Sequence, residues 1–398
     1  MGNLKTFGAK IILLIVGLAV GFLFLEFLTT AAVRLKIIPA YRTMSPNGVY
    51  HDILGYALPP HSFEDTDANG FRNPGVPESA DIVTLGDSQT YGFNALSADS
   101  WPSKLEKLTG RSVYNMGMGG YGPVQYYYLA DKALSMRPKL VILGFYAAND
   151  MSDACRMLAL DYWKNFAKEK GLDVEDCLKS LDVLLPPNSI VPKRNLLERL
   201  RDSARDSSFL MLLKQVPAVS NFISHRRDLK WAEESPNEFF VVNDGVINTI
   251  FSVGEPGAKI GFDSPNIKRG AELAKYFLGE TAKKIKAAGA ELLIVFIPDK
   301  PDVLEDYLVS KGYAIPDNYK RNVLFHEEIE KTFADFFKQL NVPTVSAKPL
   351  MVRMVGDKEN PIFNNYLDSH PFAIGYEAMA ESIAEEVERL FNGPKSGL

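Results

Sequence analysis

Four kinds of side chain that can carry acyl-transfer chemistry follow apolar runs in this sequence. Ser88 comes just after the β-prone run Asp81–Leu85, Asn149 ends LVILGFYAAN, and Asp368 and His370 stand two positions apart before a helix-like segment. A histidine can take the proton of a serine hydroxyl, while a carboxylate holds the histidine in the correct tautomer. These residue types therefore predict a serine nucleophile acting on an ester or a related acyl group.

The glycine-rich stretch VYNMGMGGYG, Val113–Gly122, supplies a possible fifth contribution. Glycine lets a backbone N–H approach a substrate oxygen closely, and the Asn149 amide is a second possible donor to a developing oxyanion. Taken alone, each block also has a structural explanation: Ser88 as a helix N-cap, Asn149 as an Asx turn, His370 as a surface residue. Nucleophile, base, acid and oxyanion donors at successive strand ends together favour the catalytic interpretation.

His370 is the only histidine placed where such a base is needed. The chain has five histidines, and the other four lie in a turn-rich stretch, in an interrupted region, or beside glutamates on an amphipathic segment: His51, His61, His225 and His326. His370 instead precedes a helix after the last expected strand. That position belongs to the same sheet edge as Ser88 and Asn149.

Alternating apolar runs and helix-like stretches must build that sheet. The expected strands are Asp81–Leu85, Ser112–Asn115, Leu140–Phe145, Leu292–Ile297 and Thr344–Ser346. The expected helices are Trp101–Leu108, Gln125–Ser135, Lys268–Ala288, Arg321–Leu340 and Gly375–Phe391. Strands that alternate with helices favour a parallel sheet covered on both faces, because parallel connections need a crossover. The sequence predicts an α/β fold.

Two stretches depart from this alternation. Residues 37–80 are rich in Pro, Gly, Asn and Asp and predict a turn-rich connector. Residues 151–266 predict an inserted cap, with helical pieces around Asn195–Val216 and a hairpin that turns at Asn243-Asp244-Gly245. We therefore expect an N-terminal segment over 1–36, the connector, and a catalytic domain over 81–394 that contains the insertion.

The run Ile11–Ala32 is almost unbroken in its hydrophobicity. As a helix its 22 residues would span about 33 Å, enough to cross a bilayer, and the run is longer than the apolar core of most signal peptides. We expect a retained transmembrane anchor, with a cleaved signal peptide as the alternative. Glu26 is the one ionisable residue in the run and marks either a partner helix or the membrane boundary. The short segment before this run favours an N-terminus inside the cell and a catalytic domain outside the cytoplasm, periplasmic or extracellular.

Composition excludes several other classes of protein. With 46% hydrophobic and 23% charged residues the chain can form a substantial core, and its net charge of −5 gives no basic surface for nucleic acid. Only two cysteines are present, Cys155 and Cys177, and neither belongs to a zinc-ligand pattern. In an oxidising compartment they could form a disulfide worth about 3 kcal/mol; two unrelated buried thiols are the alternative. No cofactor or metal is expected.

The four blocks together resemble the SGNH (GDSL-like) hydrolase superfamily. Ser88 matches the first block, Gly120 the second, which Asn115 opens, Asn149 the third and His370 the fourth. The lead-in DILGYALPP and DANGFRNPG resembles membrane-anchored bacterial members, and ELLIVFIPDKPDVL is similar to proteins that O-acetylate secreted polysaccharides. One departure from the superfamily pattern is that a single residue separates the acid from the base, where two are more usual.

This resemblance implies a flavodoxin-like three-layer α/β/α fold and a reaction. Ser88, His370 and Asp368 would be the catalytic triad, and the Ser88 and Gly120 N–H groups with the Asn149 amide would form the oxyanion hole. The expected substrate is an ester on envelope carbohydrate or lipid. The alternatives are an O-acyltransferase using the same residues and a catalytically silent assembly protein.

Overall fold

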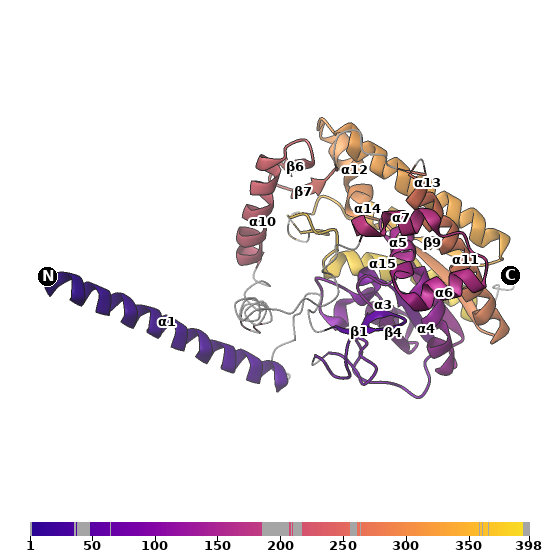
Figure 1. Ribbon diagram of the computed structural model, residues 1–398, viewed down its shortest axis with the longest axis horizontal. Coiled ribbons are helices and arrows are strands. Elements are labelled where there is room, and N and C mark those ends of the chain that lie inside the picture. Colours follow the sequence, from indigo (N-terminus) through magenta and orange to yellow (C-terminus); the bar gives the residue numbers. More distant parts are fainter. Residues whose placement is uncertain are drawn as a thin grey trace.

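A computed structural model describes residues 2–35, 37, 48–63, 65–184, 207, 209, 217–254, 261–262, 264–357, 359, 361–364 and 366–392 (Figure 1). The helical pieces expected around Asn195–Val216 therefore lie almost entirely outside the described residues. Ser88, Asn149, Asp368 and His370 lie within them.

A five-stranded parallel sheet forms the centre of the molecule. Its strands, in spatial order, are β4 (Val113–Gly117), β3 (Ile82–Gly86), β5 (Leu140–Tyr146), β8 (Glu291–Ile297) and β9 (Thr344–Ser346). Within this sheet β3 comes first in sequence; β4 then pairs on one side of it and β5 on the other, which is the flavodoxin-like order. Ligands bind in such sheets at the carboxyl ends of the two strands where the order reverses, here β3 and β5. The expected α/β class and the parallel sheet are confirmed.

Both faces of the sheet are covered by helices, which explains why its strands are apolar runs without alternation. Val141 and Leu143 face one core cluster, while Leu140 and Ile142 face the other. The first face is covered by α4 (Pro123–Ser135), α5 (Asp150–Arg156), α11 (Pro265–Ala287) and much of α13 (Asp317–Gln339). The second is covered by α3 (Trp101–Thr109), α12 (Lys300–Ser310), α14 (Lys348–Arg353) and α15 (Ala373–Asn392).

The connector contributes to the core rather than running over the surface. It forms a small antiparallel pair, β1 (Val49–His51) with β2 (Gly55–Ala57), and its apolar side chains Leu54, Leu58 and Phe71 are buried. Arg72 is 2% exposed and donates to the carbonyl oxygens of Gly92 at 2.8 Å and Ala95 at 2.9 Å. The connector therefore supports the loop that follows Ser88.

The inserted region contains several short elements. After α5 come η2 (Met157–Ala159), α6 (Asp161–Glu169) and α7 (Glu175–Leu184), and later α10 (Pro217–Glu234), β6 (Phe239–Asn243) and β7 (Asn248–Ser252). The hairpin β6–β7 turns where the sequence predicts it, with Gly245 at a φ of 79°. Cys155 and Cys177 form a disulfide with a Cα–Cα distance of 5.1 Å, which decides between the two alternatives that the sequence left open.

The N-terminal helix α1 (Gly2–Arg34) extends away from the sheet (Figure 1). Many of its described apolar side chains are exposed, among them Leu13, Leu18, Leu23 and Phe27. Within the described part of the chain, no helix meets both the length and the hydrophobicity required of a membrane span.

Candidate active site

Ser88 lies where β3 turns into the four-residue helix α2 (Ser88–Tyr91). Asp87 caps this helix by accepting a hydrogen bond from the Gln89 N–H at 2.9 Å. Gly86 is the last residue of β3, and glycine is required there because a Cβ would overlap the side chain of Thr90 in α2. The close turn places the Ser88 side chain, on a residue 7% exposed, at the carboxyl edge of the sheet.

Ser88, His370 and Asp368 form one continuous hydrogen-bonded relay. The distance from Ser88 Oγ to His370 Nε2 is 2.7 Å, and that from His370 Nδ1 to Asp368 Oδ1 is 2.5 Å. Burial raises the pKa of Asp368, but hydrogen bonds with His370 and from Asn94 outweigh burial and leave the pKa below its usual value. Asp368 is therefore a carboxylate at neutral pH, able to orient the imidazole and stabilise its protonated form.

The short spacing between acid and base is accommodated by a local turn. The backbone N–H of His370 donates to Asp368 Oδ1 at 2.9 Å, so the carboxylate folds back over the single intervening residue. The same oxygen then meets the imidazole Nδ1. One residue between Asp and His is thus sufficient in this chain.

Asn94 and Phe93 belong to the site, although the sequence did not single them out. Asn94 Nδ2 donates to Asp368 Oδ2 at 2.7 Å, and its backbone has a φ of 64°, a conformation that asparagine tolerates better than most residues. The ring of Phe93 lies 4.5 Å from that of His370, centroid to centroid. The loop after the nucleophile therefore contacts both His370 and Asp368. The only signal in the sequence is an asparagine two residues after a glycine.

Asn149 lies three residues after the end of β5, immediately before α5, and its side chain contacts the nucleophile turn. Its Nδ2 donates to Asp87 Oδ2 at 3.0 Å. Asp87 is fully buried; burial raises its pKa, while the hydrogen bonds from Asn149 and Gln89 oppose that rise. An amide nitrogen carries two hydrogens, so Asn149 keeps a second donor for a substrate oxygen.

Gly120 lies in the turn that follows β4 and has a φ of 71°, which favours glycine. Its carbonyl oxygen accepts a hydrogen bond from Arg156 at 3.2 Å, and Arg156 also pairs with Asp153. Burial raises the pKa of Asp153 to about 7, although Arg156 lowers it. Asn115, which opens this block, has a supporting role: its backbone N–H and carbonyl both bond to the Asn73 side chain of the connector.

The other histidines have other partners. His326 Nδ1 lies 2.9 Å from Asp302 Oδ1 in a second, separate His–Asp pair, and His51 Nδ1 accepts from the backbone N–H groups of Ile53 and Leu54. Among the described residues, no group of three His, Cys, Asp or Glu side chains is arranged to hold a metal ion.

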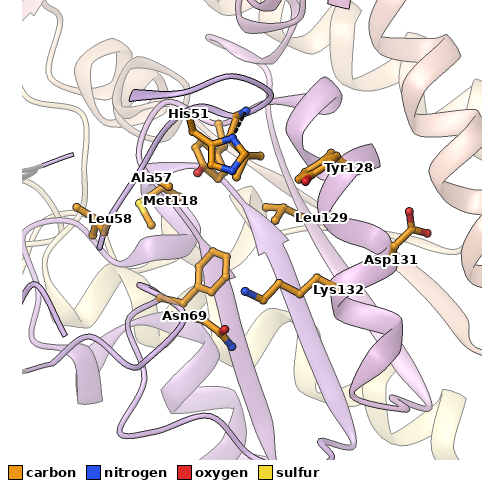
Figure 2. Close-up of a pocket in the computed structure, with 12 residues that line it drawn as sticks. His51, Ala57, Leu58, Asn69, Met118, Tyr128, Leu129, Asp131 and Lys132 are labelled. Atoms are coloured by element: carbon orange, nitrogen blue, oxygen red, sulfur yellow. Dashed lines mark hydrogen bonds between the residues drawn. The ribbon is translucent and has the colours of Figure 1, made fainter. Parts of the chain in front are cut away.

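A cavity of about 450 Å³ lies beside the connector and α4 (Figure 2). His51, Asn69, Tyr128 and Lys132 are among the residues that line it, together with Met118 from the loop after β4. The walls come from the connector, from α4 and from the loop after β4, whereas the relay is built on the end of β3 and the loop before α15. We therefore assign the chemistry to the relay.

Comparisons with known proteins find matches among solved structures alone. No family model and no curated protein matches this chain. Among solved structures, a G-D-S-L family lipolytic protein from Desulfitobacterium hafniense is 14% identical, with a TM-score of 0.34, over 76% of this chain and 97% of its own. The aryl esterase of M. smegmatis is 12% identical, with a TM-score of 0.32, over 78% and 98%. An acylhydrolase from Bacteroides fragilis is 10% identical, with a TM-score of 0.35, over 79% and 90%.

The chain is thus similar to these solved hydrolases and esterases at 10% to 14% identity. At these identities and TM-scores the similarity says nothing about substrate, so the chemistry of this chain is argued from its own side chains. Ser88 begins α2 at the end of β3, and Gly120, Asn149 and His370 lie in turns or loops that follow β4, follow β5 and precede α15. Their catalytic roles and that of Asp368 stay predictions until variants are assayed.

Proposed function

We propose that this protein is a serine ester hydrolase of the SGNH type. The observation that carries the proposal is the relay of two short contacts from Asp368 through His370 to the Ser88 hydroxyl. A surface histidine or a helix-capping serine would not require this arrangement, whereas acyl transfer does.

In the proposed reaction, His370 Nε2 takes the Ser88 proton as Oγ attacks the ester carbonyl. The N–H groups of Ser88 and Gly120 and the Asn149 amide stabilise the oxyanion. His370 then returns the proton to the leaving alcohol, and an acyl group stays on Ser88. Water, activated by the same histidine, releases the acid and restores the serine. Each step uses only side chains and backbone of this chain.

A fluorophosphonate probe tests the nucleophile directly. We expect rapid covalent labelling of the wild-type protein at Ser88, identified by peptide mass spectrometry, and no labelling of Ser88→Ala. A Ser103→Ala variant is a suitable control because Ser103 lies on α3, where its hydroxyl accepts a hydrogen bond from Ser100 at 3.2 Å and takes no part in the relay. A wild-type protein that fails to react would favour the catalytically silent assembly protein.

O-acyl transfer to a polysaccharide is the second candidate function. It is supported by the stretch Glu291–Leu304, which is similar to that of proteins that O-acetylate secreted polysaccharides. Both reactions use the same acyl-enzyme and differ only in whether water or a sugar hydroxyl takes the acyl group. Measuring free acetate and acetylated sugar from one acyl donor distinguishes the two.

We further propose that α1 anchors the protein and that the catalytic domain lies outside the cytoplasm, where ester-bearing carbohydrate or lipid of the envelope would be its substrate. The exposed apolar side chains of α1 support the anchor, and the disulfide between Cys155 and Cys177 supports an oxidising compartment.

Fractionation tests the anchor. We expect the full chain to sediment with membranes and to resist carbonate extraction, and a form comprising residues 44–398 to stay soluble. Native protein recovered in the soluble fraction with a new N-terminus near Val33 would identify a cleaved signal peptide instead.

A further inference from the structure

Lys300 is a lysine almost completely buried beside the catalytic loop. It begins α12 and is 1% exposed. Its Nζ donates three hydrogen bonds: to Thr249 Oγ1 at 3.1 Å, to the Ile250 carbonyl at 3.0 Å and to the Tyr366 carbonyl at 2.6 Å. The first two acceptors belong to β7 of the insertion, and the third lies two residues before Asp368. One ammonium group therefore joins three separate parts of the chain.

Two further contacts join the insertion to the same loop. The Thr249 hydroxyl, which accepts from Lys300, donates to the Asn364 carbonyl at 3.0 Å. Asp228 of α10 is fully buried, and its Oδ2 accepts from the Leu367 N–H at 3.0 Å. The backbone on both sides of Tyr366 is thus held by side chains of α10 and β7.

The charge of Lys300 is costly to bury, and the structure compensates only part of that cost. Its pKa is lowered to about 8, because burial lowers the pKa by more than Asp368, Asp299 and Asp228 raise it. An ammonium carries three N–H donors, which match the three acceptors; a neutral amine carries only two. An apolar residue would fill the site without this penalty, so packing alone does not explain a lysine here.

We propose that Lys300, Thr249 and Asp228 act as positioning residues, forming a clamp by which the insertion holds the loop before Asp368 and thereby sets the position of His370. The clamp consists of these three side chains and their bonds to the backbone of Asn364, Tyr366 and Leu367. The inference rests on the proposed hydrolase function and gives α10 and β7 a role in positioning the catalytic loop. Misplacing a general base by about 1 Å can cost roughly 10²-fold in rate.

A matched pair of variants tests the clamp. Thr249→Val keeps the shape of the side chain but removes the hydroxyl, whereas Thr249→Ser keeps the hydroxyl. We expect Thr249→Val and Lys300→Met to lower kcat on a nitrophenyl ester about 10- to 100-fold with little change in KM, and Thr249→Ser to retain most of the wild-type kcat. Lys283→Met is the control, because Lys283 is exposed on α11 and pairs only with Glu280 on its own helix.

Hydrogen exchange gives a readout that does not depend on turnover. The Leu367 N–H should exchange faster in Thr249→Val and in Asp228→Leu than in the wild type, when each protein is measured well below its own Tm. If Lys300→Met fails to fold, the Thr249 pair still decides the question. Equal kcat and equal exchange in Thr249→Val and Thr249→Ser would overturn the clamp, provided that the wild type reacts with the fluorophosphonate probe. A wild-type protein that the fluorophosphonate probe does not label would instead overturn the proposed hydrolase function.

The clamp also predicts a dependence on pH. As the pH rises through about 8, Lys300 loses a proton and one of its three donors, so kcat should fall. Lys300→Met should have a low kcat without this alkaline decline. An unchanged decline in Lys300→Met would show that the charged amine is not the acting form.

Discussion

We expect His370→Ala to abolish ester turnover as completely as Ser88→Ala. The Ser88 hydroxyl has the His370 imidazole 2.7 Å away as its base, and removal of either group leaves the other without a function in the reaction. Because the residues of a triad act as a unit, each single variant and the double variant should lose about 10⁴-fold or more in kcat/KM, with no additivity. Initial rates on a nitrophenyl ester, with Tm measured in parallel, provide the test.

His61→Ala is the matched control for this experiment. His61 is exposed in the connector, and its Nδ1 faces the Thr66 carbonyl at 3.3 Å, so its loss should leave the rate unchanged. Wild-type turnover in His370→Ala would contradict the mechanism altogether. Turnover lost in Ser88→Ala but kept in His370→Ala would require a different base, and among the described residues no other histidine contacts Ser88.

The centre of the sheet was predictable because β3, β5 and β8 are short, mainly apolar runs that helices bury on both sides. The five expected strands coincide with β3, β4, β5, β8 and β9 to within a few residues, as do five of the major helices. The parallel pairing of the strands then follows from the rule that parallel strands need crossovers, whereas the flavodoxin-like order was implied by the resemblance to SGNH hydrolases. Ser88, Asn149 and His370 could be placed at one edge because the carboxyl ends of parallel strands lie together.

The residues that support the site could not be predicted in this way. Asn94 reaches Asp368 across 274 positions of sequence, and Asp228 reaches Leu367 across 139. Neither has a neighbour in sequence whose type suggests the contact. Lys300 reads as an ordinary polar residue at a helix start, and only the fold makes it a buried one.

The connector is a case where composition was a poor guide to packing. Its many Pro, Gly, Asn and Asp residues predict turns, and turns are present, but between them Leu54, Leu58 and Phe71 enter the core. Arg72 of the connector is also buried, and its guanidinium donates to carbonyl oxygens in the loop after Ser88. These oxygens are near Arg72 in the folded chain but not in the sequence, so composition does not predict the contact. Turn-rich sequence can therefore still be a structural part of a catalytic domain.

Asp368→Asn should reduce kcat substantially but less than His370→Ala. Asp368 Oδ1 accepts from both the backbone N–H and the Nδ1 of His370, and Oδ2 accepts from Asn94. An asparagine keeps one acceptor but replaces the other with an N–H group and loses the negative charge. Either the amide faces Asn94 donor to donor, or it turns and presents its N–H to the imidazole, which then favours the wrong tautomer.

We therefore expect a loss of about 10²- to 10⁴-fold in kcat for Asp368→Asn, with KM little changed, since the carboxylate acts through His370 and does not touch the ester. Asp335→Asn, an exposed position on α13, is the control for the charge change. Adding Asn94→Asp to Asp368→Asn restores a donor–acceptor pair but not the charge next to the imidazole. That double variant should recover only part of the lost kcat, because it allows the correct tautomer of His370 but does not restore the charge. Wild-type kcat in Asp368→Asn would reduce the triad to a Ser88–His370 dyad.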